Sequence, residues 1–83
     1  MIKWIRSDKY STKKCPMYFH PTYKYALIKE KYPLPHWCLL KKIEINEAQG
    51  IARWEYLEHF LSNIKFSDAK LWFENSKYNK EAD

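Results

Sequence analysis

Hydrophobic and polar residues alternate along three segments in the first half of the chain. These segments are residues 2–6, 22–30 and 37–45, and a period of two is typical of a strand with one buried face. Between the last two segments lie Pro33 and Pro35, which are incompatible with a central strand and favour a turn. The pattern therefore predicts a short N-terminal strand followed by an antiparallel hairpin.

The hydrophobic period changes beyond the third of these segments. Asn46 is a suitable N-cap, with Gln49 three residues later. Four apolar residues then fall within one arc of a helical wheel at about 100° per residue: Trp54, Leu57, Leu61 and Ile64. We therefore predict an amphipathic helix over residues 46–64, in which Gly50 either permits close approach to the sheet or belongs to a turn that precedes the helix.

A second helix is expected near the end of the chain. Ser67 is a candidate N-cap, and Phe66 and Leu71 have the spacing of a hydrophobic staple. This helix has apolar groups on two sides, so either one side is available to a partner or the second side holds only the staple with Phe66 and an ordinary exposed Tyr. The first side holds Ala69, Trp72, Phe73 and Ser76, and the opposite stripe holds Leu71, Asn75 and Tyr78.

These elements predict a single α+β domain spanning residues 1–83, with the last few residues frayed. Its small antiparallel sheet, an N-terminal strand plus a hairpin, is followed by two helices packed on one face. A chain of this length buries only about 60% of the surface that it exposes when unfolded, so its core is thin. The hydrophobic fraction of 46% still indicates a folded protein rather than a disordered one.

The composition also bears on the compartment. Two cysteines are too few for a secreted disulfide framework, and the first residues lack the apolar run of a signal peptide. No segment reaches the roughly 18 apolar residues that are needed to cross a bilayer. We therefore expect a soluble, cytoplasmic protein that does not associate with membranes.

Charge is unevenly divided along the chain. Residues 1–42 carry a formal charge of +8 and residues 43–83 carry −3, which gives the net charge of +5. A basic half favours an acidic partner, either nucleic acid or a negatively charged protein. Thirteen of the fifteen basic residues are Lys, whereas base readout and bidentate phosphate binding favour Arg, so sequence-specific nucleic-acid recognition is disfavoured.

The predicted hairpin places lysines among aromatic rings. If the helices cover one face, the other face would display a basic aromatic set: Lys24, Tyr25, Lys41 and Lys42, with Tyr32 at the tip. Such a set suits single-stranded nucleic acid, whose bases stack on rings while lysines follow the phosphates. It equally suits a protein interface, because Tyr is enriched in hot spots and a basic rim accelerates encounter with an acidic partner. The chain contains neither an RNP aromatic motif nor a GXXG loop, so no known nucleic-acid module supports the first option.

Two further surfaces are candidates for binding. Arg53 falls within the apolar arc of the first predicted helix, where either its stem lies along the edge of the arc or its side chain anchors a partner. The stripe of Leu71, Asn75 and Tyr78 would pair two copies of the second helix, which predicts a weak or moderate homodimer. The same stripe would also serve a foreign partner.

Metal binding and catalysis are considered and disfavoured. Cys15, His20, His36 and Cys38 have zinc-ligand identities, but their spacing matches no common zinc motif. The alternative, buried reduced cysteines with surface histidines, is preferred, so we assign no metal, cofactor or catalytic residue. Glu55 and His59, four residues apart, would form a helix-surface pair rather than an acid–base pair.

The chain contains no glycine-rich phosphate loop, nucleophile elbow or carboxylate cluster. We therefore expect a non-enzymatic protein that binds a protein partner stoichiometrically, as an inhibitor or regulator. Its use of many Lys, Asn, Ile, Tyr and Phe residues is typical of AT-rich coding DNA, which is common in phages and mobile elements and also in many bacterial genomes. The alternative is non-specific binding of single-stranded RNA or DNA through the basic hairpin.

Overall fold

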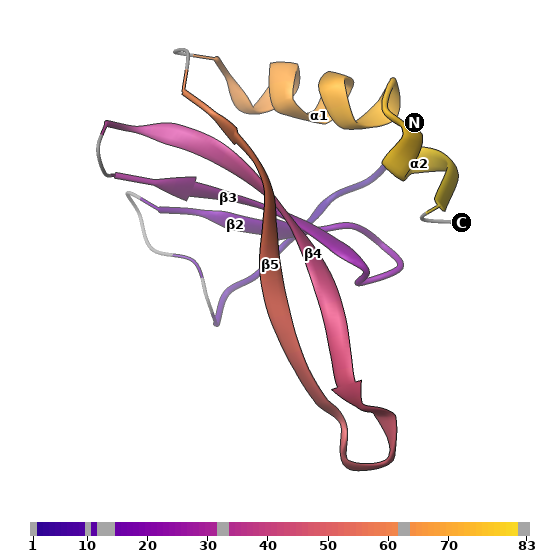
Figure 1. Ribbon diagram of the computed structural model, residues 1–83. Helices are drawn as coiled ribbons and strands as arrows, with labels where there is room; N and C mark the ends of the chain where they lie inside the picture. Colours follow the sequence, from indigo (N-terminus) through magenta and orange to yellow (C-terminus); the bar gives the residue numbers. More distant parts are fainter. Residues whose placement is uncertain (1, 10, 12–14, 32–33, 62–63, 82–83) are drawn as a thin grey trace.

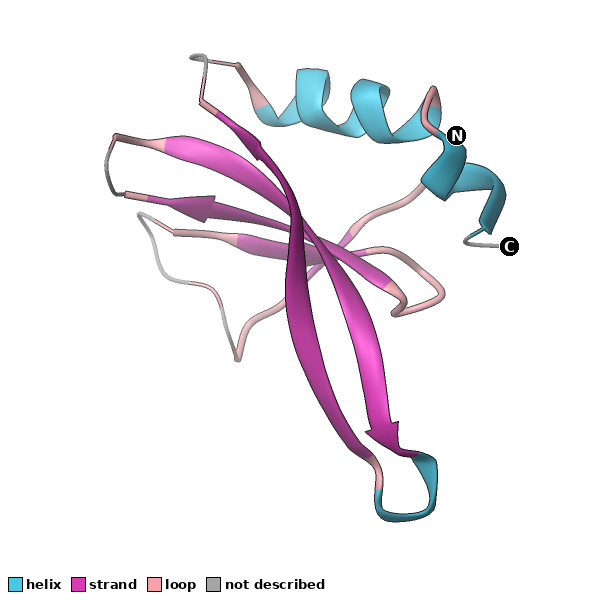
Figure 2. Ribbon diagram, in the orientation of Figure 1, coloured by secondary structure: helices cyan, strands magenta, loops and turns pink. Residues whose placement is uncertain are grey.

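Five strands and two helices make up the described part of the chain in the computed structural model (Figures 1 and 2). The structure describes residues 2–9, 11, 15–31, 34–61 and 64–81. The bounds of the elements are β1 Ile5–Arg6, β2 Met17–Phe19, β3 Tyr25–Glu30, β4 His36–Asn46, a 3-10 turn Glu47–Gln49, β5 Ile51–Phe60, α1 Phe66–Glu74 and α2 Lys77–Glu81.

The strands form one antiparallel sheet in which sequence neighbours are also spatial neighbours, in the order β1-β2-β3-β4-β5. The predicted hairpin is confirmed as β3 and β4, in register from Tyr25 opposite Lys41 to Glu30 opposite His36. Two helices follow the sheet, which confirms the α+β fold class. None of the helices in the described ranges has the length and apolar character that crossing a bilayer requires.

One face of the sheet carries the main core. Tyr25, Leu27, Trp37 and Leu39 alternate along β3 and β4 and pack against Ala69 and Phe73 of α1; we call these six residues the helix-face core. Figure 1 shows α1 lying across this face. Burial of this aromatic and aliphatic surface provides most of the hydrophobic stabilisation available to so small a domain.

The other face carries a smaller group of buried residues: Met17, Ala26, Cys38 and Leu40, which we call the opposite-face cluster. Phe19, Ile28 and Trp54 pack against this cluster and are themselves partly buried. Within the described residues no helix covers this face, so these side chains shield one another. The face is therefore apolar at its centre without a second layer of secondary structure.

The predicted helix over residues 46–64 is wrong, because residues 51–60 form β5. A β-bulge explains the false helical period: Leu39 pairs with Glu58 but Leu40 pairs with Tyr56, which leaves Leu57 as an extra residue. Leu57 and Phe60 both pack on the helix-face core, although residues three apart point to opposite faces of a regular strand. A bulged strand thus imitates the i, i+3 spacing of a helix.

The expected helix start is instead a tight turn between β4 and β5. The backbone N–H of Gln49 donates to the side-chain oxygen of Asn46, at 3.3 Å, so Asn46 caps a single 3-10 turn. Gly50 follows with φ of +66°, a conformation that non-glycine residues rarely adopt. Of the two interpretations of Gly50, the turn is therefore correct, and no helix follows it.

The two N-terminal strands are short. The expected strand over residues 2–6 is reduced to Ile5–Arg6, and β2 was not predicted. Three residues of β2 are too few to display a period. The Ser11 hydroxyl accepts a hydrogen bond from the Met17 N–H at 2.8 Å and donates to the Met17 carbonyl at 3.1 Å, which fixes the start of β2.

The cap and the staple predicted for the last long helix are also wrong. Lys65 is the N-cap of α1, and its N–H donates to the Asp68 carboxylate at 3.0 Å. The helix therefore begins at Phe66, whose ring stacks on Tyr18 and Trp37 at centroid distances of 4.2 and 4.9 Å. Phe66 packs on the sheet rather than on Leu71.

A two-stranded ribbon extends from the sheet. The last residue of β4 that pairs with β3 is Lys41, and beyond it β4 pairs only with β5. We call residues 42–54 the β4–β5 arm, which projects away from the helices in Figures 1 and 2. An isolated two-stranded ribbon is marginally stable in water, so the arm depends on the sheet at its base.

Candidate functional site

The end of the β4–β5 arm exposes branched apolar side chains. Ile45 and Ile51 are 63% and 47% exposed, and Ile51 pairs with Asn46 next to the turn. Single exposed apolar residues are ordinary. Two isoleucines at the end of a projecting ribbon, where none of the other described elements buries them, form a small apolar tip available to a partner.

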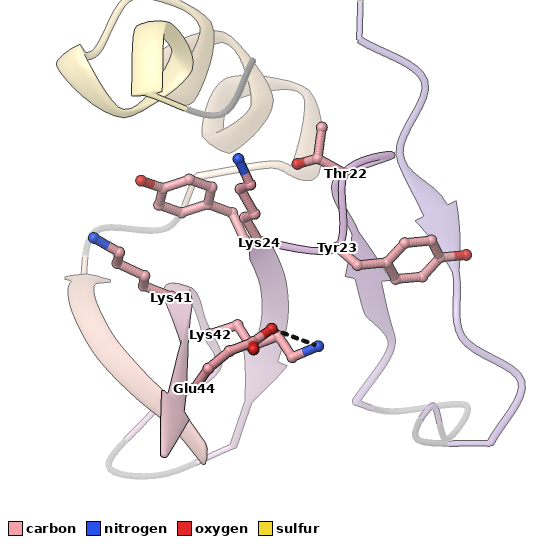
Figure 3. A pocket seen from close by; sticks show the side chains of 7 residues that line it. Thr22, Tyr23, Lys24, Lys41, Lys42 and Glu44 are labelled. Carbon is pink, nitrogen blue, oxygen red and sulfur yellow. Dashed lines mark ion pairs between the residues drawn. The ribbon is translucent and has the colours of Figure 1, made fainter. Parts of the chain in front are cut away.

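A basic hollow of about 430 Å³ lies at the base of the arm (Figure 3). It is lined by Thr22, Tyr23, Lys24, Tyr25, Lys41, Lys42 and Glu44. The antiparallel register creates it: Tyr25 lies opposite Lys41, and the Lys42 N–H donates to the Lys24 carbonyl at 2.9 Å. The Lys42 ammonium lies 3.8 Å from the Glu44 carboxylate, so the hollow is basic but also holds an acidic group.

The predicted basic aromatic set is brought together only in part. Lys24, Lys41 and Lys42 do line one hollow. The expected exposure of Tyr25 is wrong: the alternation of β3 places its ring beside Leu27 in the helix-face core, where it is 1% exposed. Tyr32 lies outside the described residues.

Tyr23 is the exposed ring at this hollow, and it was not predicted as a binding residue. Its φ of 59° places it in the left-handed region, within the turn between β2 and β3. Figure 3 shows its ring directed away from the lysine side chains. The hollow therefore presents ammonium groups without an aromatic platform between them.

Arg53 lies on the arm rather than on a helix. It is an exposed residue of β5 and pairs with Ile43 of β4, so its expected place within a helical apolar arc is wrong. None of the described elements covers the arm, so the Arg53 side chain is exposed to solvent. It adds positive charge between the apolar tip and the basic hollow. Its expected role in partner binding stays a prediction.

The outer side of α1 forms a second, shallower surface. Leu71 is 57% exposed and lines a hollow with Asp68, Trp72, Asn75 and Ser76. Tyr78 does not continue this stripe, because it is half-buried and its ring lies 5.8 Å from Tyr25 of the core. The weak or moderate homodimer expected through this stripe stays a prediction, which sedimentation of the full chain can test.

The four residues considered as zinc ligands are not brought together. His20 contacts Trp4 and Phe73 on the helix side of the sheet, each at a centroid distance of 5.5 Å, whereas Cys38 belongs to the opposite-face cluster. His36 and Cys38 do lie together, and they are joined by His59. His59 was not predicted as their neighbour, because its segment was predicted to be a helix.

Hydrogen bonds and burial define the surroundings of these three residues. The pKa of the Cys38 thiol is raised to about 12, mainly by burial and to a smaller extent by the negative charge of Glu30. The Tyr56 hydroxyl donates to the Glu30 carboxylate, and this bond is the main reason that the pKa of Tyr56 is raised to about 12.

The expected Glu55–His59 pair is wrong, since Glu55 lies opposite Lys41 and His59 lies opposite Cys38.

The β4–β5 arm and the basic hollow thus form one continuous candidate surface, and the group of His36, Cys38 and His59 lies at the other end of β4 and β5. The chain matches no protein-family model, and no curated protein or solved structure is significantly similar to it.

Proposed function

We propose that the protein binds an acidic protein partner stoichiometrically through the β4–β5 arm and the basic hollow at its base. The observation that carries this proposal is the apolar tip of Ile45 and Ile51 at the end of a projecting ribbon. Apolar anchors that become fully desolvated contribute most of the affinity of protein interfaces. The tip offers such anchors where no part of the described chain can cover them.

Charge supports an acidic partner. Lys24, Lys41 and Lys42 line the hollow at the base of the arm, and Arg53 lies on the arm itself. Complementary charge around an apolar anchor accelerates association and fixes the orientation of the partner. The arrangement of anchor and basic rim matches the usual anatomy of a protein interface.

Single-stranded nucleic acid remains the alternative, with less support. Base stacking requires exposed rings among the lysines, but Tyr25 is buried and the ring of Tyr23 is directed away from them. Glu44 lies within the hollow and Glu55 lies opposite Lys41. These carboxylates oppose a uniformly anionic phosphate backbone more than they oppose a protein of mixed charge.

The proposed role is that of a non-enzymatic inhibitor or regulator encoded by a phage or mobile element. It acts in the cytoplasm, where the thiols of Cys15 and Cys38, neither of which forms a disulfide, would stay reduced. Such a role requires only a surface that covers part of another protein. The arm, which extends beyond the rest of the sheet, is suited to insert into a cleft of that partner.

We expect the tagged full-length chain to recover an acidic protein from nuclease-treated lysate and to form a 1:1 complex with it after separate purification. Ile45→Asp should weaken that complex about 30-fold or more, the effect of a hot-spot residue. Leu34→Asp is the matched control, because Leu34 is exposed at the opposite end of β4. Binding is measured by titration calorimetry, and the stoichiometry by light scattering.

Equal affinity of the Ile45→Asp variant and the wild-type chain would contradict the arm as the binding surface. Recovery of nucleic acid alone from untreated lysate, with affinity that falls steeply with salt, would favour the alternative. Circular dichroism of both variants ensures that the comparison is made between folded proteins.

A further inference from the structure

Three potential metal ligands converge on the sheet face opposite the helices. His36 and Cys38 are two residues apart on β4, so their side chains point to the same face, and His59 is the cross-strand partner of Cys38 on β5. His59 Nδ1 lies 3.2 Å from Cys38 Sγ and 3.2 Å from His36 Nε2. All three ligand atoms lie within 4.8 Å of one another.

Two of these distances resemble the edges of a tetrahedral zinc site, whereas the bound of 4.8 Å on the whole set leaves the third pair, Cys38 Sγ and His36 Nε2, wider apart. Zinc–nitrogen bonds of about 2.05 Å and zinc–sulfur bonds of about 2.3 Å place two nitrogens about 3.3 Å apart and a sulfur and a nitrogen about 3.6 Å apart. The observed separations of His59 Nδ1 from its two neighbours are both 3.2 Å. Rotamer adjustments of a few tenths of an ångström would bring those two pairs to the zinc values.

The hydrogen bonds of His36 orient its ring for coordination. His36 Nδ1 lies 2.7 Å from the Leu34 carbonyl oxygen; because a carbonyl can only accept, Nδ1 carries the proton. In the neutral ring Nε2 therefore has the lone pair, directed toward His59. A backbone carbonyl that fixes the tautomer of a histidine in this way is the usual outer partner of a metal-bound imidazole.

The ring of His59 is held from one side by an aromatic neighbour. Tyr56 stacks on it at a centroid distance of 4.9 Å and an interplanar angle of 14°. Stacking restricts rotation of an otherwise exposed side chain and keeps Nδ1 turned toward Cys38. The histidine is thus oriented for ligation, although it lies at the edge of the sheet.

We propose that His36 Nε2, Cys38 Sγ and His59 Nδ1 bind one Zn²⁺, with a fourth position open to water. A soft thiolate with two imidazoles selects zinc over magnesium or calcium, which require oxygen ligands. The site is separate from the β4–β5 arm, because it lies at the other end of strands β4 and β5.

Zinc binding changes the protonation of two of the three ligands. The Cys38 thiol releases its proton to solvent as the zinc–sulfur bond forms. In the metal-free protein, His59 Nδ1 carries a proton and donates a hydrogen bond to His36 Nε2. When zinc binds, this proton moves to His59 Nε2, so that the lone pair of Nδ1 can bind the metal. One proton is therefore released for each zinc bound by the neutral cluster.

Cobalt(II) titration of the purified full-length chain, after treatment with a chelator, tests the site. We expect one Co²⁺ per chain, with a near-ultraviolet thiolate-to-cobalt charge-transfer band and tetrahedral visible bands that equimolar Zn²⁺ abolishes. Cys38→Ser should lose the charge-transfer band, and His59→Gln should weaken binding at least tenfold. His59 is exposed, so its replacement leaves the fold intact even if Cys38→Ser does not fold.

Cys15→Ser and His20→Gln are the matched controls, because His20 lies on the other side of the sheet and Cys15 is outside the cluster. Both variants should bind cobalt as the wild-type chain does. A wild-type chain without a charge-transfer band would show that the three groups form only a hydrogen-bonded cluster. A cobalt affinity of His59→Gln equal to that of the wild-type chain, or a band that disappears in Cys15→Ser, would overturn the proposed ligand set.

Discussion

Phe73→Ala is expected to lower the free energy of unfolding by about 3–5 kcal/mol, the range for large aromatic residues removed from a core. Phe73 is fully buried, and its ring lies 5.2 Å from Trp4 and 5.2 Å from Tyr25, between centroids. It attaches α1 to the sheet together with Ala69 and Phe66. A domain of this size has a total stability on the order of 5–15 kcal/mol, so the variant loses a large share of it.

Urea unfolding followed by tryptophan fluorescence measures this loss. Leu71→Ala, two residues earlier on α1, is the matched control: Leu71 is 57% exposed, so its truncation should change stability by no more than about 0.5 kcal/mol. Similar effects of the two substitutions would show that α1 packs with a different face on the sheet.

Cys38 is expected to react with thiol reagents at least about 100-fold more slowly than an unfolded cysteine, in chelator at about pH 8. The fully buried thiol has a pKa of about 12 instead of 9.0. That shift lowers its thiolate fraction about 1,000-fold, part of which is offset because a less acidic thiol gives a more nucleophilic thiolate. Burial adds a further barrier, since reagent must await local opening.

Single-thiol variants separate the two cysteines: Cys15→Ser reports Cys38, and Cys38→Ser reports Cys15. Both thiols should react at similar rates in denaturant. Rapid labelling of Cys38 in the folded chain would contradict its burial in the opposite-face cluster.

The same raised pKa predicts a pH dependence of stability. Between about pH 9 and pH 12 the unfolded chain loses the Cys38 proton while the folded chain keeps it. The unfolded state then binds fewer protons, so the free energy of unfolding falls as pH rises through this window. The fall should be steeper in the wild-type chain than in Cys38→Ser.

Regular alternation made the centre of the sheet predictable from sequence. The segments that became β3 and β4 keep a strict period of two where they contact the helix-face core. β5 could not be predicted in this way, because the bulge at Leu57 shifts the side-chain pattern by one residue and produces helical spacing. The cap at Asn46 added to the error, since one 3-10 turn and a full helix share the same start signal.

The candidate surface was predictable only where it depends on the hairpin register. Lys24, Lys41 and Lys42 cluster because β3 and β4 pair as expected. Whether the Tyr25 ring is buried or exposed depends on which face of the sheet the helices cover, and the alternation of residues alone does not determine that face. His59 was missed because its proximity to Cys38 follows from strand pairing across 21 residues, which a helical assignment of the segment excludes.

Hydrogen–deuterium exchange of the free chain and of its purified complex is the most direct test of partner binding through the arm. In the free chain residues 42–54 should exchange rapidly, because a two-stranded ribbon opens easily. In the complex these residues should become strongly protected, while α1 and α2 exchange as before. Protection confined to α1 and α2, with an arm that exchanges as fast as in the free chain, would contradict partner binding through the arm.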